Sequence, residues 1–206
     1  AEGWNPLAAP YELWMSGTRK ERHIAEQMVE ELVHTMYPEA EHQDPFWIKE
    51  ARNVFIALVY VLFILAKPEE VNLASVYYLM AKGEERFGAS TYLKTLVELL
   101  EGHENVAMQL LSYVTTANDT RAGIRSTFLD GLSIATKSES VRNFLSHDDL
   151  QINRLTGDKP TLVYIIIPDE TPIYDELTGV LVSQLMNHYV RIAEQDYAGK
   201  LPIRVN

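Results

Sequence analysis

The sequence predicts a mainly helical protein with a smaller α/β piece at its C-terminal end. Between about residues 16 and 150, apolar residues recur at helical spacing, and Pro or Gly residues interrupt the pattern. KPTLVYIIIPDE then forms an almost continuous apolar run, typical of a strand buried on both faces. The chain has 206 residues, of which 47% are hydrophobic, so it can bury a sizeable core.

The helical part is expected to follow a connector. Residues 1–15 contain Pro6 and Pro10, which predict an extended segment there. Capping residues, Pro and Gly then set the expected helix limits. The predicted helices run from Ser16 or Thr18 to Tyr37, from Asp44 to Ala66, from Asn72 or Ser75 to Ala81, from Ser90 to Gly102, over 104–116, from Asn118 or Asp119 to Lys137, and over 139–145 after Ser138.

The helix from Asp44 is expected to be central, because it holds the longest apolar run, Val54–Ala66. That run is shorter than the roughly 20 residues a membrane-spanning helix needs, so it indicates a core helix. The positions expected to be buried are Val54, Leu58, Val61 and Leu65.

Beyond residue 150 the pattern predicts a partial α/β domain over 151–206. DLQINRL reads as a weak strand or extended segment, and Thr161–Ile167 as a strong strand. A helix from Asp175 to about Tyr197 follows, with an apolar stripe at Leu177, Leu181, Leu185 and Tyr189, and LPIRV ends the chain as another strand. This βαβ unit lacks sheet neighbours in the sequence, so we expect an exposed apolar edge that self-associates or is poorly ordered.

Composition excludes several kinds of chemistry. The chain has no cysteine, and no histidine pair has the spacing of metal ligands, so we expect no metal site. Neither a phosphate-binding loop nor a nucleophile motif is present, so no catalytic residue is assigned. The net charge of −11 disfavours general binding to DNA and favours a basic partner surface.

Two groups of polar residues are candidate sites. Arg121, Arg125, Lys137 and Arg142 could form a basic strip for DNA or an acidic partner. We favour ion pairing with nearby carboxylates, which include Glu98, Glu101, Asp130 and Glu139. Asp169 and Glu170 follow the predicted strand, at the edge where open α/β sheets bind ligands. They could lie near a nucleotide, at a subunit contact, or simply in a solvated turn.

Four segments taken in order carry a family resemblance: WNPL from Trp4, DPFWIKEARNVFIALVYVL from Asp44, FLSHDDLQINRL, and KPTLVYIIIPDE with its helix and GKLPIRV. Together they resemble TraG/TraD-type coupling proteins of conjugation and type IV secretion. The resemblance implies an all-α domain, residues 16–150, inserted into a RecA-like P-loop motor domain. Residues 1–15 and 151–206 would then be parts of that motor.

The resemblance also implies what the intact parent protein does. Its Walker A and Walker B elements would lie outside this sequence, so ATP and Mg²⁺ are expected for the parent and no cofactor for this fragment. The parent would be a homo-hexamer at the cytoplasmic face of the bacterial inner membrane. Its partners would be a relaxase and other DNA-processing proteins, or secreted proteins, together with the secretion channel. The alternative is a helical effector domain of a regulator that binds a small ligand.

Overall fold

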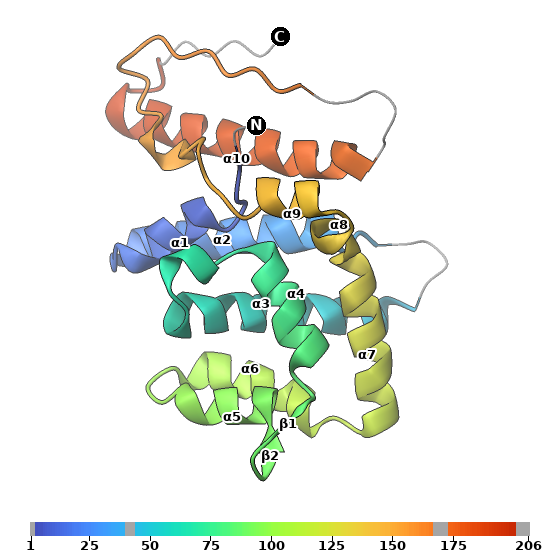
Figure 1. Ribbon diagram of the computed structural model, residues 1–206. Helices are drawn as coiled ribbons and strands as arrows, with labels where there is room; N and C mark the ends of the chain where they lie inside the picture. Colours follow the sequence, from blue (N-terminus) through green and yellow to red (C-terminus); the bar gives the residue numbers. More distant parts are fainter. Residues whose placement is uncertain (1–2, 40–43, 167–172, 201–206) are drawn as a thin grey trace.

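The computed structural model describes residues 3–39, 44–166 and 173–200, and the helices in this part of the chain form stacked layers (Figure 1). In chain order the elements are α1 (Ala8–Met15), α2 (Arg19–Met36), α3 (Pro45–Leu65), η1 (Pro68–Glu70), α4 (Leu73–Lys82), β1 (Arg86–Phe87), β2 (Ser90–Thr91), α5 (Tyr92–Leu99), α6 (Glu104–Thr115), α7 (Asn118–Gly131), α8 (Ser133–Thr136), α9 (Glu139–Phe144), η2 (Ile152–Arg154) and α10 (Ile173–Asp196).

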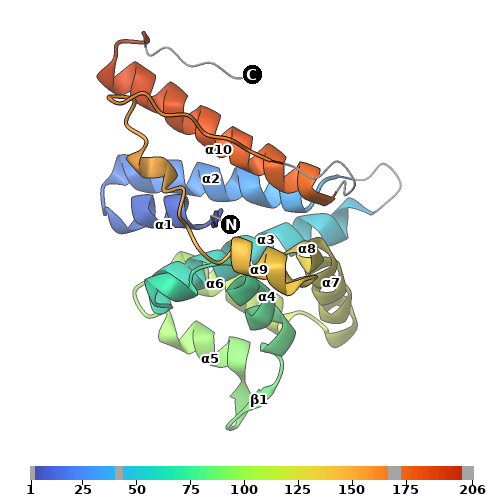
Figure 2. The ribbon, with the colours of Figure 1, turned by 45° about the horizontal axis from the view of Figure 1, so that its top comes forward.

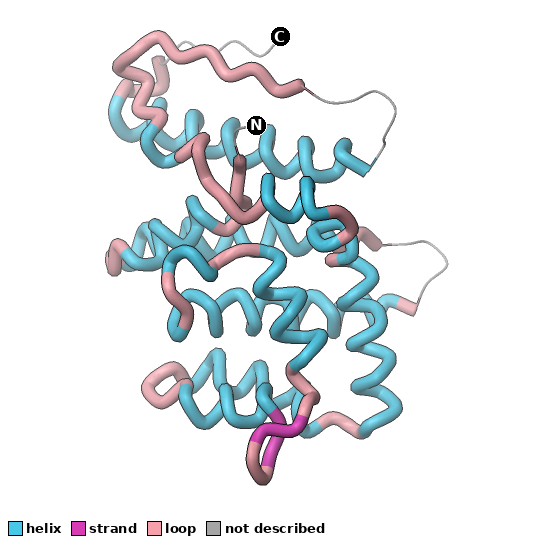
Figure 3. Tube along the Cα trace, in the orientation of Figure 1, coloured by secondary structure: helices cyan, strands magenta, loops and turns pink. Residues whose placement is uncertain are grey.

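Helix α3 lies at the centre of the layers. It contacts α2 on one side and α6 on the other, while α4 and α7 pack beside it. Helix α10 covers α2 at one end of the molecule, and α5 covers α6 at the opposite end (Figure 2). The strands β1 and β2 are an antiparallel pair at the α5 end, where Figure 3 shows them as a short hairpin. The prediction of a mainly helical protein is therefore confirmed.

The start and the core of α3 follow the sequence closely. Asp44 is the N-cap, its side chain accepts a hydrogen bond from the backbone N–H of Phe46, and Pro45 takes the first helical position. Val54, Leu58 and Val61 are buried as predicted. Leu65 is 40% exposed, so its predicted burial is wrong. It is the last residue of α3, where burial falls off from Phe63 through Ile64 to Leu65.

Most other helix starts also agree with their capping residues. The side chains of Thr18, Asn72 and Ser138 cap α2, α4 and α9 as predicted. The cap of α5 is Thr91, one residue after the predicted Ser90. Helix α7 has Ala117 at its N-cap with no side-chain hydrogen bond, so neither Asn118 nor Asp119 caps it.

The N-terminal segment differs from its predicted extended form. Ala8–Met15 is helix α1, in which Pro10 occupies the third position. A proline is tolerated there because the first N–H groups of a helix have no partner within the helix. Trp4 is buried and its backbone N–H donates to the carbonyl of Phe144, while the side-chain amide of Asn5 donates to the carbonyl of Val71. These contacts anchor the segment in the helical core.

The predicted βαβ unit is not confirmed. Ile152–Arg154 is a 3₁₀ turn where a strand or extended segment was predicted. Residues 161–166 pair with no other described segment and form no strand. A strand is stable only beside a neighbour that accepts its backbone hydrogen bonds. Ile167 and the predicted strand LPIRV lie outside the described residues. Helix α10 begins at Ile173, two residues before Asp175, and it buries Leu177, Leu181 and Leu185 as predicted.

Candidate functional site

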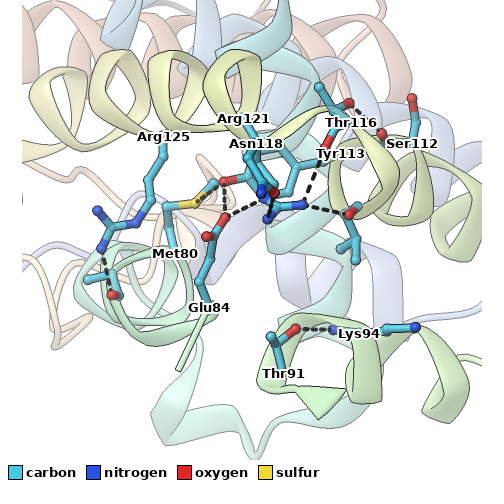
Figure 4. A network of polar contacts seen from close by, with 12 residues as sticks. Met80, Glu84, Thr91, Lys94, Ser112, Tyr113, Thr116, Asn118, Arg121 and Arg125 are labelled. Atoms are coloured by element: carbon cyan, nitrogen blue, oxygen red, sulfur yellow. Dashed lines mark hydrogen bonds and ion pairs between the residues drawn. The ribbon is translucent and has the colours of Figure 1, made fainter. Parts of the chain in front are cut away.

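A network of polar side chains joins α4, α6 and α7 (Figure 4). Glu84, just after α4, lies at its centre. Its Oε1 atom accepts from the Nε–H of Arg121 at 2.8 Å and from the hydroxyl of Tyr113 at 3.2 Å. The same hydroxyl lies 3.4 Å from the sulfur of Met80. One carboxylate therefore connects three helices that are distant in the sequence.

Arg121 has the most contacts in this network. Its Nη1 atom lies 2.9 Å from the carbonyl of Val114 and 3.3 Å from that of Thr116, and its Nη2 lies 2.8 Å from Oδ1 of Asn118. The carbonyls belong to the C-terminal end of α6, where the helix dipole places partial negative charge. The guanidinium thus caps α6 while it pairs with Glu84.

Arg125 caps the C-terminal end of another helix, α4, in a similar way. Its Nη2 atom donates to the carbonyl of Ala81 in the last turn of α4, at 2.7 Å. Its Nε atom is buried and has no partner among the described residues. Both arginines of α7 therefore bind C-terminal carbonyls of neighbouring helices, which ties α7 to α4 and α6.

The residues of the predicted basic strip lie on α7, on α9 and just after α8. Lys137 follows α8 and is exposed, and Arg142 on α9 lies 3.4 Å from the hydroxyl of Tyr78. Ion pairing was the favoured interpretation, and Arg121 is indeed paired. Its partner is Glu84 and none of the carboxylates named from the sequence. Nothing local could have revealed Glu84, which is 37 positions away along the chain. Contact of this strip with a partner stays a prediction.

Tyr113 is a neutral hydrogen-bond donor in this network. Burial raises the pKa of its hydroxyl, and the negative charge of Glu84 raises that pKa further. The proton therefore stays on Tyr113, and the hydroxyl donates a hydrogen bond to Glu84. The arrangement stabilises the packing of the three helices.

A second feature is a cavity of about 580 Å³ between the N-terminal segment, α9 and α10. Its apolar lining includes Trp4, Phe144 and Leu177, together with Ile165 and Ile166 of the segment predicted as a strand. The indole Nε1 of Trp4 is buried without a partner among the described residues. The cavity thus lies where the sequence predicts the α/β piece.

Asp169 and Glu170 lie outside the described residues, so their predicted role is untested. The described part of the chain holds no cluster of three His, Asp or Glu side chains that could share a metal ion. Among the same residues, none of the helices has both the length and the apolarity needed to cross a bilayer.

Fold and charge together define an acidic, mainly helical domain in which the polar network around Glu84 holds α4, α6 and α7 together. The chain belongs to the type IV secretory system conjugative DNA transfer family, whose family model matches residues 4–202. This match confirms the resemblance to TraG/TraD-type coupling proteins. No curated protein matches the chain.

Proposed function

We propose that this chain is the partner-recognition part of a coupling protein, which links the DNA-processing complex to the type IV secretion channel. The observation that carries the proposal is the family match over residues 4–202, nearly the whole sequence. It supports a role in conjugative DNA transfer. The step from that role to partner recognition rests on the helical fold and its charge.

Charge supports a protein partner over DNA. The chain has 29 Asp and Glu residues against 18 Lys and Arg residues, and DNA would be repelled by that excess. Two of the candidate cations, Arg121 and Arg125, already donate to groups within the chain. A basic surface, such as that of a relaxase or a secreted protein, is the better electrostatic match.

The proposal extends to the intact coupling protein. We infer that it uses ATP and Mg²⁺ through elements that this sequence does not contain, and that it works as a homo-hexamer at the cytoplasmic face of the inner membrane. These inferences rest on the family and on the missing phosphate-binding loop in this chain. The chain alone is accordingly expected to have no ATPase activity.

The test compares two partners of the purified chain. We expect the cognate relaxase to bind it in a calorimetric titration, and we expect duplex DNA to bind weakly at about 0.15 M salt. Tight DNA binding with a steep dependence on salt, without binding of relaxase or secreted protein, would overturn the proposal. Clear ATP turnover, lost on a point mutation within the chain, would overturn its catalytic part.

A further inference from the structure

The groove between α2 and α10 has an unusual set of hydrogen-bonding groups. The two helices run in opposite directions at the end of the molecule (Figure 2). The groove has a volume of about 830 Å³ and is lined mainly by α2 between Lys20 and Glu31 and by α10 between Gln184 and Gln195. A space of this size can hold several side chains of a partner.

The first relevant observation is the set of carboxylates along the walls. Glu26, Glu30 and Glu194 line the groove, and among the described residues none of them forms an ion pair with Lys or Arg. Glu26 lies 3.7 Å from His23, and Glu30 lies 4.0 Å from His34. These carboxylates therefore have capacity for an external cation.

The groove is also lined by Lys20 and Arg191, and Arg191 already has a hydrogen-bond partner. Lys20 lies where α2 begins, and Arg191 is on the facing C-terminal half of α10. A guanidinium nitrogen of Arg191 lies 2.9 Å from Nδ1 of His188, which accepts its hydrogen. Positive charge is thus confined to one end, and the carboxylates of Glu26 and Glu30 lie further along α2.

The second, independent observation is a buried acceptor that lacks a donor. Gln184 is 2% exposed, and its Nε2 donates to the carbonyl of Pro6 at 2.9 Å. That bond fixes the amide orientation, because a carbonyl needs a donor. The Oε1 atom of Gln184 is left without a partner among the described residues. A buried acceptor in that state is destabilising, so it indicates a missing donor.

Asn153, which also lines the groove, repeats this pattern. Its Nδ2 donates to the carbonyl of Ala9 and to the carboxylate of Glu12, at 3.0 and 3.1 Å. Its Oδ1 is buried and lacks a donor in the described structure. Gln184 and Asn153, which both line the groove, therefore each carry a buried side-chain oxygen without a donor among the described residues.

Apolar side chains complete the site. Ile24, Met28 and Val190 line the groove between the polar groups. Lys and Arg side chains match this combination, because they carry an apolar stem and a charged head rich in N–H donors. Phosphate groups do not match it, because they have no donors and share the sign of the carboxylates.

We propose that the groove between α2 and α10 binds a lysine- or arginine-rich segment of a partner protein. This inference rests on the proposed function, since it names the chemistry by which the chain recognises a partner. The net charge of −11 would also steer such a segment toward the chain.

The experiment uses the 206-residue chain and a short fluorescent peptide of lysine, arginine and alanine. Fluorescence anisotropy compares it with the same peptide in which glutamate replaces every basic residue. We expect the basic peptide alone to bind. Glu26→Gln combined with Glu30→Gln should weaken binding roughly fivefold or more at low salt, because the variant loses two exposed ion pairs with the peptide.

The matched control is Glu98→Gln combined with Glu101→Gln, which removes the same charge at the α5 end. It should change affinity by less than about twofold, since those carboxylates are remote from the groove. The methyl resonance of Met28 should also shift when the peptide binds to the wild-type chain.

Two results would overturn the groove assignment. Equal losses in both double variants would mean that net charge alone attracts the peptide. No binding of the basic peptide would mean that the groove takes no such segment. Relaxase binding measured in parallel separates the two levels, because a chain that binds relaxase but not the peptide keeps the proposed function and loses only the groove.

Discussion

At the scale of single residues, stability depends strongly on the buried apolar side chains of α3. Leu58 is fully buried at the centre of that helix, whereas Leu65 at its end is 40% exposed. Leu58→Ala should lower the free energy of unfolding by about 2–5 kcal/mol, because it removes buried methyl groups and leaves a cavity. Leu65→Ala should lower it by less than about 1 kcal/mol. Urea unfolding measures both, and a small effect at Leu58 would contradict the core assignment.

His188 is a polar residue that is buried in its neutral form. Its Nε2 donates to the carbonyl of Leu155 at 2.8 Å, and its Nδ1 accepts from Arg191. Burial lowers its pKa, and the charge of Arg191 lowers it too, against the opposing effect of the Leu155 hydrogen bond. A proton on Nδ1 would face the Arg191 donor, so the folded chain resists protonation.

The lowered pKa of His188 makes the stability of the fold depend on pH. Below the ordinary histidine pKa of about 6.5, the unfolded chain takes up a proton that the folded chain does not. The free energy of unfolding should therefore fall as pH drops from about 6.5 toward the lowered pKa, by at most about 1.4 kcal/mol per pH unit. His188→Gln should flatten this slope in urea titrations between about pH 5.5 and 7.5. His103→Gln, at the exposed start of α6, keeps His188 and should keep the slope.

The two arginines of α7 show what the sequence could not reveal about the candidate site. Arg121 and Arg125 look like a basic strip, because they are one turn apart on the same helix. Their partners, Glu84 and the carbonyl of Ala81, come from another helix and its end. Such partners depend on how helices pack, and helix packing leaves no local signal at the arginine positions.

At the scale of elements, small residues decide how closely α7 approaches its neighbours. A Cβ atom at Gly131 would lie 2.2 Å from the ring of Tyr37. The Tyr37 ring is buried, and its hydroxyl donates to the carbonyl of Phe128, which is on α7 like Gly131. The ring therefore has little freedom to move. Glycine at this position therefore permits the contact between α7 and the end of α2.

Two glycine-to-alanine changes in helices should consequently have opposite signs. Gly131→Ala should lower the free energy of unfolding by about 1–3 kcal/mol, because overpacking outweighs the better helix propensity of alanine. Gly179 is in α10, and a Cβ there meets no atom within 4 Å. Gly179→Ala should raise the free energy of unfolding by about 0.4–1 kcal/mol. Thermal unfolding of both variants checks the pair, and a stabilising Gly131→Ala would contradict the close packing.

Elements with a strong local signal were predictable. Asp44 with Pro45 marks the start of α3, and Thr18 and Asn72 mark α2 and α4, because a capping side chain bonds within its own turn. Helix α1 was missed, since Pro10 reads as a breaker unless its place in the first turn is known. Helix α7 begins without a capping side chain, so its start had no local marker.

At the scale of the whole molecule, the helical layers and the C-terminal segment differ in how complete their packing is. The layers bury a continuous core that extends from Trp4 through α3 to Leu185 of α10. Residues 161–166 contribute less to this core. The side chains of Leu162, Tyr164 and Ile166 are 73, 80 and 91% exposed. These positions alternate along the chain, as they would on one face of a strand. The sequence could predict a strand here, but a sheet also needs neighbouring strands.

An exposed apolar segment with free backbone groups favours association between chains. We therefore expect the isolated chain either to self-associate through residues 161–166 or to leave them poorly ordered while the helical layers stay compact. Tyr164→Lys should reduce any concentration-dependent light scattering, because a charge would then lie in the contact. Met108→Lys is the matched control, since Met108 is 63% exposed on α6, near the opposite end of the molecule. A strictly monomeric chain whose residues 161–166 are as protected from hydrogen exchange as α3 would contradict this expectation, because the segment would then complete its fold without further strands.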